Sequence, residues 1–455
     1  MKVFSSFCVG AVFILPAAAT ELPGFDVLRF NDDVFANEAI ANDPGWYPQI
    51  KYYPLSVGED AFVSIGGEVR QRGDYFENPD FGGAPFSQSS AWLQRYVLHA
   101  DARWNSAVRT FVQVSGALEE GREGGPSPVD ENGFEIQNAF LDLSLPNEGL
   151  LRLGRQELKY GSGRLVDVRE GPNVRRTFTG GVLSFALADL DVDLLYAVPQ
   201  HPELGNFNDD ANDDESLSGI YATQAIRDGS ASLEWYALRF EDQAGRHMGE
   251  VSREERYSLG TRYSGRRDEF DWNTEAIIQF GTFGSKDILA WTVANQFGYT
   301  FRRLPMRPRI GLSTNMASGD SDPLDDRLGS FNAIYPRGNY FSEAAILGPR
   351  NFFNVHPSVE FQVRDNVSLV FDTNFFWRLE TGDGVYGPPG NLIRGPGGSD
   401  ERFVGQSISA NLAYQLSREF SVGFVYTHFL TGSFLEETGP SEDIDFFELT
   451  ATWKF

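Results

Sequence analysis

The sequence has little cysteine and histidine and no long apolar run after its first residues, and each shortage excludes a class of protein. Cys8 is the only cysteine, which leaves no disulfide framework and no cysteine metal site. A membrane-spanning helix needs about 18 consecutive apolar residues, and no such run occurs downstream of residue 19. The five histidines are His99, His201, His247, His356 and His428. They form no i, i+4 metal pair and no recognisable Ser/His/Asp arrangement, so the sequence predicts neither a cofactor nor a metal site.

The N-terminus has the layout of a secretory signal peptide. Lys2 supplies a positive charge, an apolar stretch runs from Val9 to Leu15, and alanines at 17–19 provide an A-x-A cleavage signal. The apolar stretch is too short to span a bilayer. We therefore expect a signal peptide over residues 1–19, an extended periplasmic or plugging segment over residues 20–58, and a barrel over residues 59–455.

The rest of the chain is rich in glycine and aromatic residues and alternates between apolar and polar positions. Between Phe447 and Phe455 every odd position is apolar. The even positions are Glu448, Thr450, Thr452 and Lys454. One face of such a strand suits lipid and the other suits water, and only a closed sheet satisfies every backbone hydrogen bond within hydrocarbon. The predicted fold class is all-β, a transmembrane antiparallel up-and-down β-barrel.

Short and long connections alternate along most of the chain. Tight links are expected near 105–106, 146–149, 227–229, 265–268, 304–306, 365–366 and 417–419. Long polar stretches occupy 74–90, 119–132, 200–215, 241–253, 319–350, 381–401 and 431–445. Outer-membrane barrels have short periplasmic turns and longer extracellular loops. Counting from Phe62 gives about 18 strands, a barrel wide enough for an aqueous channel.

Charge is distributed unevenly along the chain. Acidic clusters at 209–215 and 320–326 are interpreted as solvated loop tips, with a divalent-cation site as the alternative. A basic segment and one early strand supply the candidate pore cations. These are Arg95, Arg103, Arg152, Arg155, Lys159, Arg164, Arg169, Arg175 and Arg176.

Two interpretations of these cations follow from where they can lie. A charge on the lipid face costs roughly 2–4 kcal/mol at mid-depth, so the side chains are expected in the lumen or at its rims. A lumen lined with arginine would attract anions. The alternative is a ladder of ion pairs, in which the arginines bind the four carboxylates of Glu68, Asp101, Asp142 and Glu157.

Three long segments, together with the closing strand, resemble the alginate-export outer-membrane proteins. The segments are Leu153–Phe178, Gly329–Ser358 and Asp383–Gln406, and the resemblance covers nearly the whole chain after the signal peptide. It implies a barrel of about 18 strands with an arginine-rich conduit for a polyuronate such as alginate. The arginines inside the first segment are Arg155, Arg164, Arg169, Arg175 and Arg176.

The sequence thus predicts an outer-membrane channel that exports an anionic polysaccharide and performs no covalent chemistry. The alternative is a substrate-specific or general uptake porin for small anions or oligosaccharides. A third hypothesis, an outer-membrane hydrolase, would require His356 or His428 beside a serine or carboxylate at the rim. The expected partners are the saccharide, outer-membrane lipid and the assembly machinery, whose recognition signal the terminal Phe455 resembles. No nucleic acid is expected.

Overall fold

The structure is a computed structural model that describes residues 25–32, 50–58, 61–227 and 229–455. The predicted signal peptide lies outside these residues, as does part of the predicted periplasmic segment. No helix in the described ranges is long and apolar enough to span a bilayer.

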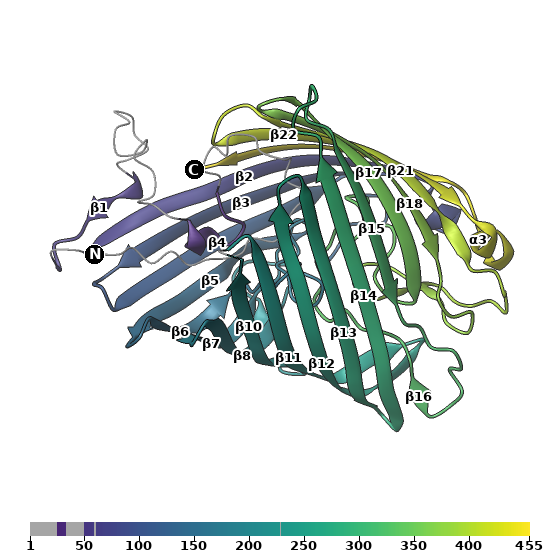
Figure 1. The fold of residues 1–455 in the computed structure, drawn as a ribbon, viewed down its shortest axis with the longest axis horizontal. Helices are drawn as coiled ribbons and strands as arrows, with labels where there is room; N and C mark the ends of the chain where they lie inside the picture. Colours follow the sequence, from purple (N-terminus) through teal and green to yellow (C-terminus); the bar gives the residue numbers. More distant parts are fainter. Residues whose placement is uncertain (1–24, 33–49, 59–60, 228) are drawn as a thin grey trace.

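The fold is a closed barrel of 18 antiparallel strands, each paired with its neighbours in the chain (Figure 1). The barrel strands are β2 (Phe62–Glu77), β3 (Gln88–Arg103), β4 (Val108–Glu120), β5 (Asn132–Leu145), β6 (Gly149–Gln156), β7 (Phe178–Leu187), β8 (Leu190–His201), β10 (Glu215–Ile226), β11 (Ala231–His247), β12 (Glu250–Arg267), β13 (Phe270–Phe283), β14 (Lys286–Thr300), β15 (Arg309–Ala317), β17 (Phe352–Arg364), β18 (Val367–Trp377), β21 (Phe403–Gln415), β22 (Phe420–Thr431) and β23 (Ile444–Lys454). The last strand, β23, pairs antiparallel with the first, β2, and this pairing closes the barrel.

Short elements lie outside the wall. They are the 3-10 helices η1 (Arg29–Asn31) and η2 (Pro79–Gly82), the helix α3 (Ser433–Thr438), and the short strands β1 (Tyr53–Pro54), β9 (Asp210–Ala211), β16 (Arg327–Leu328), β19 (Val385–Tyr386) and β20 (Leu392–Arg394). Over the described residues the protein is therefore almost entirely a single sheet.

Polar side chains are buried and apolar side chains are exposed along the wall, the reverse of a soluble protein. In β13, Asp271, Glu275 and Gln279 are at most 8% exposed, whereas Ile278 and Phe280 are 46% and 40% exposed. Such a surface is stable where lipid rather than water surrounds the barrel. The predicted fold class is confirmed, and the alternating pattern of the sequence is its physical cause.

The described N-terminal residues contact the interior of the barrel. Phe30 is 5% exposed and packs edge-on against Phe111 and Phe140, with ring centroids 5.8 and 5.2 Å away. Arg175 donates a hydrogen bond to the carbonyl oxygen of Val27 at 2.7 Å. The role of residues 20–58 as a periplasmic or plugging segment stays a prediction. The boundary between residues 58 and 59 stays a prediction.

One predicted long loop is wrong. Instead of a loop over 241–253, β11 continues to His247 and β12 begins at Glu250. Met248 and Gly249 join them with φ angles of 46° and 87°, the left-handed conformations that two-residue hairpin turns require. Ion pairs between the two strands, such as Arg239 of β11 with Glu255 of β12 at 3.0 Å, connect the polar ends of this hairpin. The polar residues of 241–253 therefore belong mainly to the two strands of a hairpin and not to a loop.

Candidate functional site

Two long connections fold into the barrel instead of projecting from it. The first inner loop (157–177) joins β6 to β7, and the second inner loop (318–351) joins β15 to β17. On one wall, Arg70 of β2 donates to the carbonyl oxygens of Glu170 and Pro172 at 3.0 and 3.1 Å. On the opposite wall, Ser162 donates to Glu275 of β13 at 2.5 Å. The first inner loop therefore crosses the lumen.

The two inner loops are joined by backbone hydrogen bonds. Val166 and Tyr335 form a parallel bridge. The amide of Asp167 donates to Tyr335 at 2.9 Å, and the amide of Arg337 donates to Gly163 at 3.0 Å. The sequence analysis expected a water-filled channel, but part of the lumen is occupied by these packed loops, because apolar side chains such as Val166 find a buried partner there.

The four carboxylates named in the ion-pair interpretation all bind arginine. Arg95 lies 2.6 Å from Glu68 and also binds Glu170. Asp101 binds Arg109 at 2.7 Å. On the wall, Arg152 of β6 lies 2.7 Å from Asp142. In the first inner loop, Arg175 lies 2.9 Å from Glu157. These paired arginines hold the wall and the first inner loop together, and their charge is neutralised where they lie.

Other predicted pore cations are also close to acids. Lys159 lies 3.3 Å from Asp167. Arg164 lies 3.1 Å from Glu275. Arg155 donates to the carbonyl oxygen of Ile136 at 2.9 Å, with Glu135 at 3.9 Å.

Arg103 lies apart from the inner loops, at the end of β3. Its guanidinium is 3.9 Å from Asp101, and its side chain is 38% exposed. It belongs to the rim of the barrel at the short-turn end and not to the region where the inner loops meet.

Arg169 and Arg176 differ from the rest because neither makes an ion pair with any described residue. Arg169 donates to the carbonyl oxygen of Val174 at 3.1 Å, and its buried Nε has no hydrogen-bond partner. Arg176 donates to the carbonyl oxygen of Pro336 at 3.3 Å and lies 5.1 Å from the ring centroid of Tyr335. Both side chains keep partial exposure.

The second inner loop adds a third arginine of the same kind. Arg337 donates to the carbonyl oxygen of Tyr340 at 3.1 Å and lies 5.5 Å from its ring centroid. Its Nε is buried without a partner, and the guanidinium makes no ion pair within the described part of the chain. Gly338 brings the two loops close, since a Cβ there would lie 3.0 Å from Cγ of Arg169. We call Arg169, Arg176 and Arg337 the cationic cluster.

Burial is the main cause that lowers the pKa of all three cluster arginines. Burial, and then the positive charge of Arg176, lower the pKa of Arg169 to about 9. Burial lowers the pKa of Arg176, and burial followed by the charge of Arg164 lowers the pKa of Arg337. All three remain charged at neutral pH. An entering carboxylate would relieve this electrostatic cost by pairing with them.

The sequence analysis missed Arg337, although its segment was among those that carry the family resemblance. Its only signal was an arginine among proline, glycine and aromatic residues in the stretch from Tyr335 to Phe341. The wall arginines Arg256 and Arg262 were also missed, and they bind the carboxylates of Glu254 and Glu234. Their alternation with Tyr257 and Tyr263 in β12 could have placed them in the lumen.

The two histidines of the hydrolase hypothesis each bind an aspartate. His356 lies 2.9 Å from Asp372, and His428 lies 2.9 Å from Asp445. Within the described ranges, no group of three or more His, Cys, Asp or Glu side chains could hold a metal ion.

A family model described as alginate export matches residues 62–447. The chain belongs to the alginate export family. Its fold is that of outer-membrane porins, as three solved structures illustrate. A BenF-like porin from Pseudomonas fluorescens Pf-5 has a TM-score of 0.60 at 10% identity, covering 87% of this chain and 99% of its own. Pseudomonas aeruginosa OccK2, solved in complex with glucuronate, has a TM-score of 0.59 at 13% identity, and the match covers 87% of this chain and 98% of OccK2. Acinetobacter baumannii OccAB1 has a TM-score of 0.59 at 11% identity, and the match covers 90% of this chain and 99% of OccAB1.

At these identities the structures establish the fold of this alginate export family member and nothing more. The chain has no significant match among curated proteins. The family and the fold are those of transport barrels in the outer membrane.

Proposed function

We propose that this family member is an outer-membrane channel for export of an acidic, uronate-type polysaccharide, which contacts the cationic cluster as it passes through the lumen. The observation that carries the proposal is the cluster itself: three charged arginines inside the barrel, on two joined loops, which donate to backbone carbonyl oxygens and make no ion pair to any described residue. Family membership supports a polyuronate as the substrate. A porin of the same fold was solved with glucuronate, the monomer class expected here.

The chemistry of the cluster suits a sugar carboxylate. A guanidinium presents two parallel N–H donors that match the two oxygens of a carboxylate. Tyr335 and Tyr340 lie beneath Arg176 and Arg337 and hold these side chains in place. Conduction requires binding strong enough to admit the ion and weak enough to release it. A repeating polyuronate satisfies both conditions, because each departing carboxylate is replaced by the next along the polymer.

A second candidate is uptake of small uronates or oligosaccharides. It is favoured by the packing of the two inner loops, which fill part of the lumen and leave less room for a polymer. Both candidates use the cationic cluster, and they differ in the length of the saccharide that can pass.

Planar-bilayer recording of the refolded barrel tests the proposal. Oligouronates of increasing length are added to one side, with neutral oligosaccharides of equal length as the comparison. We expect block of the ion current by oligouronates and weakening of that block by about a hundredfold or more in the triple variant Arg169→Gln, Arg176→Gln, Arg337→Gln, which removes three charge-assisted contacts.

The control is Arg303→Gln, which removes one exposed arginine in the turn between β14 and β15. Indifference to oligouronates, or equal block by neutral sugars, would contradict the proposal. Transport of dimers and trimers with exclusion of longer chains would favour uptake over export.

A further inference from the structure

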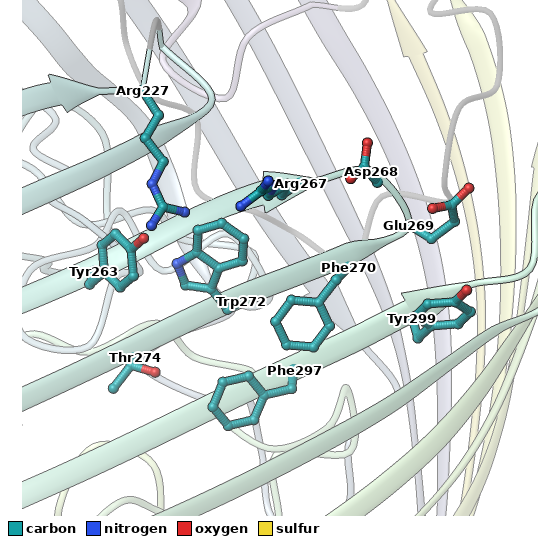
Figure 2. Close-up of a pocket in the computed structure, with 10 residues that line it drawn as sticks. All are labelled: Arg227, Tyr263, Arg267, Asp268, Glu269, Phe270, Trp272, Thr274, Phe297 and Tyr299. Atoms are coloured by element: carbon teal, nitrogen blue, oxygen red, sulfur yellow. The ribbon is translucent and has the colours of Figure 1, made fainter.

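A cavity of about 620 Å³ opens on the outer surface of the barrel, at the end that carries the short turns (Figure 2). Its floor consists of aromatic rings from three adjacent strands. These are Tyr263 of β12, Phe270 and Trp272 of β13, and Phe297 and Tyr299 of β14. Phe270 and Phe297 are 43% and 40% exposed. A concave, partly exposed aromatic floor of this kind suits an apolar chain.

Strand alternation places this cavity on the lipid side of the wall. The residues on either side of Trp272 in β13 face the lumen, where Asp271 binds Arg309 and Asn273 binds Arg262. Trp272 and the other floor residues therefore point outward. Since short turns lie on the periplasmic side of an outer-membrane barrel, the cavity faces the periplasmic leaflet.

Charges of both signs surround the floor. Arg227 and Arg267 approach the ring of Trp272, whereas Asp268 and Glu269 lie beyond Arg267, toward Tyr299 (Figure 2). The Arg227 guanidinium carbon lies 5.9 Å from the Trp272 ring centroid. None of these four charged side chains makes an ion pair or side-chain hydrogen bond with a described residue. Two positive and two negative charges thus remain available at opposite parts of one cavity.

Trp272 adds a donor that also lacks a partner. Its side chain is 8% exposed, and its indole Nε1 is buried with no hydrogen-bond partner among the described residues. Gly265 makes room for the ring, because a Cβ there would lie 2.8 Å from the indole. Buried N–H groups are nearly always bonded, so an acceptor from outside the chain is expected next to this nitrogen.

We propose that the cavity binds a phospholipid with a zwitterionic, amine-bearing headgroup from the periplasmic leaflet. The lipid phosphate accepts hydrogen bonds from Arg227, Arg267 and the indole N–H of Trp272. The headgroup ammonium pairs with Asp268 and Glu269, and an acyl chain lies on the aromatic floor. A purely anionic headgroup would be repelled by the carboxylates of Asp268 and Glu269 and would leave them unpaired. A free phosphate would leave the aromatic floor of the cavity uncovered.

Native mass spectrometry of the full chain in detergent tests this site. The purified barrel is titrated with phosphatidylethanolamine, with phosphatidylglycerol, and with soluble O-phosphoethanolamine. We expect phosphatidylethanolamine to be retained about tenfold more tightly than phosphatidylglycerol. O-phosphoethanolamine should not compete at equal concentration, because it has no acyl chain.

Two double variants separate the charges. Arg227→Gln with Arg267→Gln should lose retention of both lipids, and Asp268→Asn with Glu269→Gln should lose only the preference between them. Arg266→Gln is the matched control, since Arg266 adjoins Arg267 but points to the other face of β12. Trp272→Phe keeps an aromatic side chain but removes the N–H donor, and should weaken retention.

The proposal is overturned if wild-type protein retains both lipids equally, if O-phosphoethanolamine displaces the lipid, or if Arg266→Gln weakens retention as much as the arginine pair. All four charged residues of the double variants lie at the surface, and gel mobility of heated against unheated samples verifies that each variant is folded.

Discussion

Arg175 and Arg176 are adjacent in the chain, yet they belong to two different electrostatic regions. Arg175 binds Glu157 at 2.9 Å and Glu170 at 3.1 Å. Arg176 makes no ion pair with a described residue and donates to backbone carbonyl oxygens. The difference teaches that a high density of arginine in a sequence does not by itself create a positive lumen. Only arginines without a nearby carboxylate retain charge that an anion can use.

The largest effect is expected from removing a paired arginine. Arg95→Met removes the arginine that the Glu68 and Glu170 carboxylates share and leaves them only Lys454, 3.6 Å from Glu68, and Arg175, 3.1 Å from Glu170, which should destabilise the barrel by about 3 kcal/mol. Urea unfolding of the barrel in lipid, followed by tryptophan fluorescence, measures the loss. Arg169→Met is the matched control and should cost only about 1.5 kcal/mol, because it removes one hydrogen bond from a charged donor and leaves no carboxylate without its cation. Equal losses would remove the distinction between paired and unpaired arginines.

The next effect separates the two neighbours by function. Arg176→Gln should weaken oligouronate block about tenfold, the contribution of one charge-assisted hydrogen bond, and leave the urea midpoint nearly unchanged. Arg175→Gln should do the reverse, lowering the midpoint because Glu157 and Glu170 lose their shared partner. Current block and unfolding are measured on the same preparations. If both variants weaken the block alike, Arg175 also contacts the substrate.

A smaller effect is expected from separating the inner loops. A Cβ at Gly338 would lie 2.6 Å from Cδ of Pro172, so Gly338→Val should push the second inner loop away from the first. Such overpacking costs about 1–3 kcal/mol. Single-channel conductance should rise as the loops part. Gly395→Val is the control, because nothing lies within 4 Å of a Cβ at that loop position. Unchanged conductance in Gly338→Val would mean that the ion path avoids the contact between the loops.

The smallest effect concerns a carboxylate that no arginine neutralises. Burial, and then the negative charge of Asp383, raise the pKa of Asp320 in the second inner loop to about 6. The positive charge of Lys286 opposes this rise weakly. His247 lies 3.9 Å from the Asp320 carboxylate. The folded state therefore binds a proton more tightly than the unfolded state, whose pKa is near 3.8. The contribution of Asp320 to stability should therefore fall as pH rises from about 4 to about 6.

Asp320→Asn should flatten this dependence, because the amide does not titrate. Resistance of the second inner loop to protease across this pH range is the measurement. If the difference in protease resistance between wild type and Asp320→Asn does not change with pH, the assignment to Asp320 is contradicted.

The wall of the barrel was predictable because lipid imposes one rule on every strand. The alternation between Phe447 and Phe455 defines β23, and the short links near 146–149 and 365–366 coincide with turns. The rule fails beyond the hydrocarbon, where both faces of a strand are polar. That is why 241–253 was predicted as a loop although it forms the end of a hairpin.

The interior was less predictable, because its contacts join residues far apart in the chain. The pairing of Glu68 and Glu157 with arginine followed from the sequence as one of two interpretations, and the structure confirms it. The ion pair between Arg95 and Glu170 forms only because the first inner loop crosses the lumen. No local sequence pattern encodes that crossing. Arg337 joins the cationic cluster only because the second inner loop also folds inward.

The most direct test of the cationic cluster is the reversal potential of single barrels in a potassium chloride gradient. The wild-type protein should be anion-selective, and the triple variant Arg169→Gln, Arg176→Gln, Arg337→Gln should shift strongly toward cations, while Arg303→Gln stays close to wild type. Cation selectivity of the wild-type barrel, or a triple variant with unchanged reversal potential, would show that the cluster does not control which ions enter.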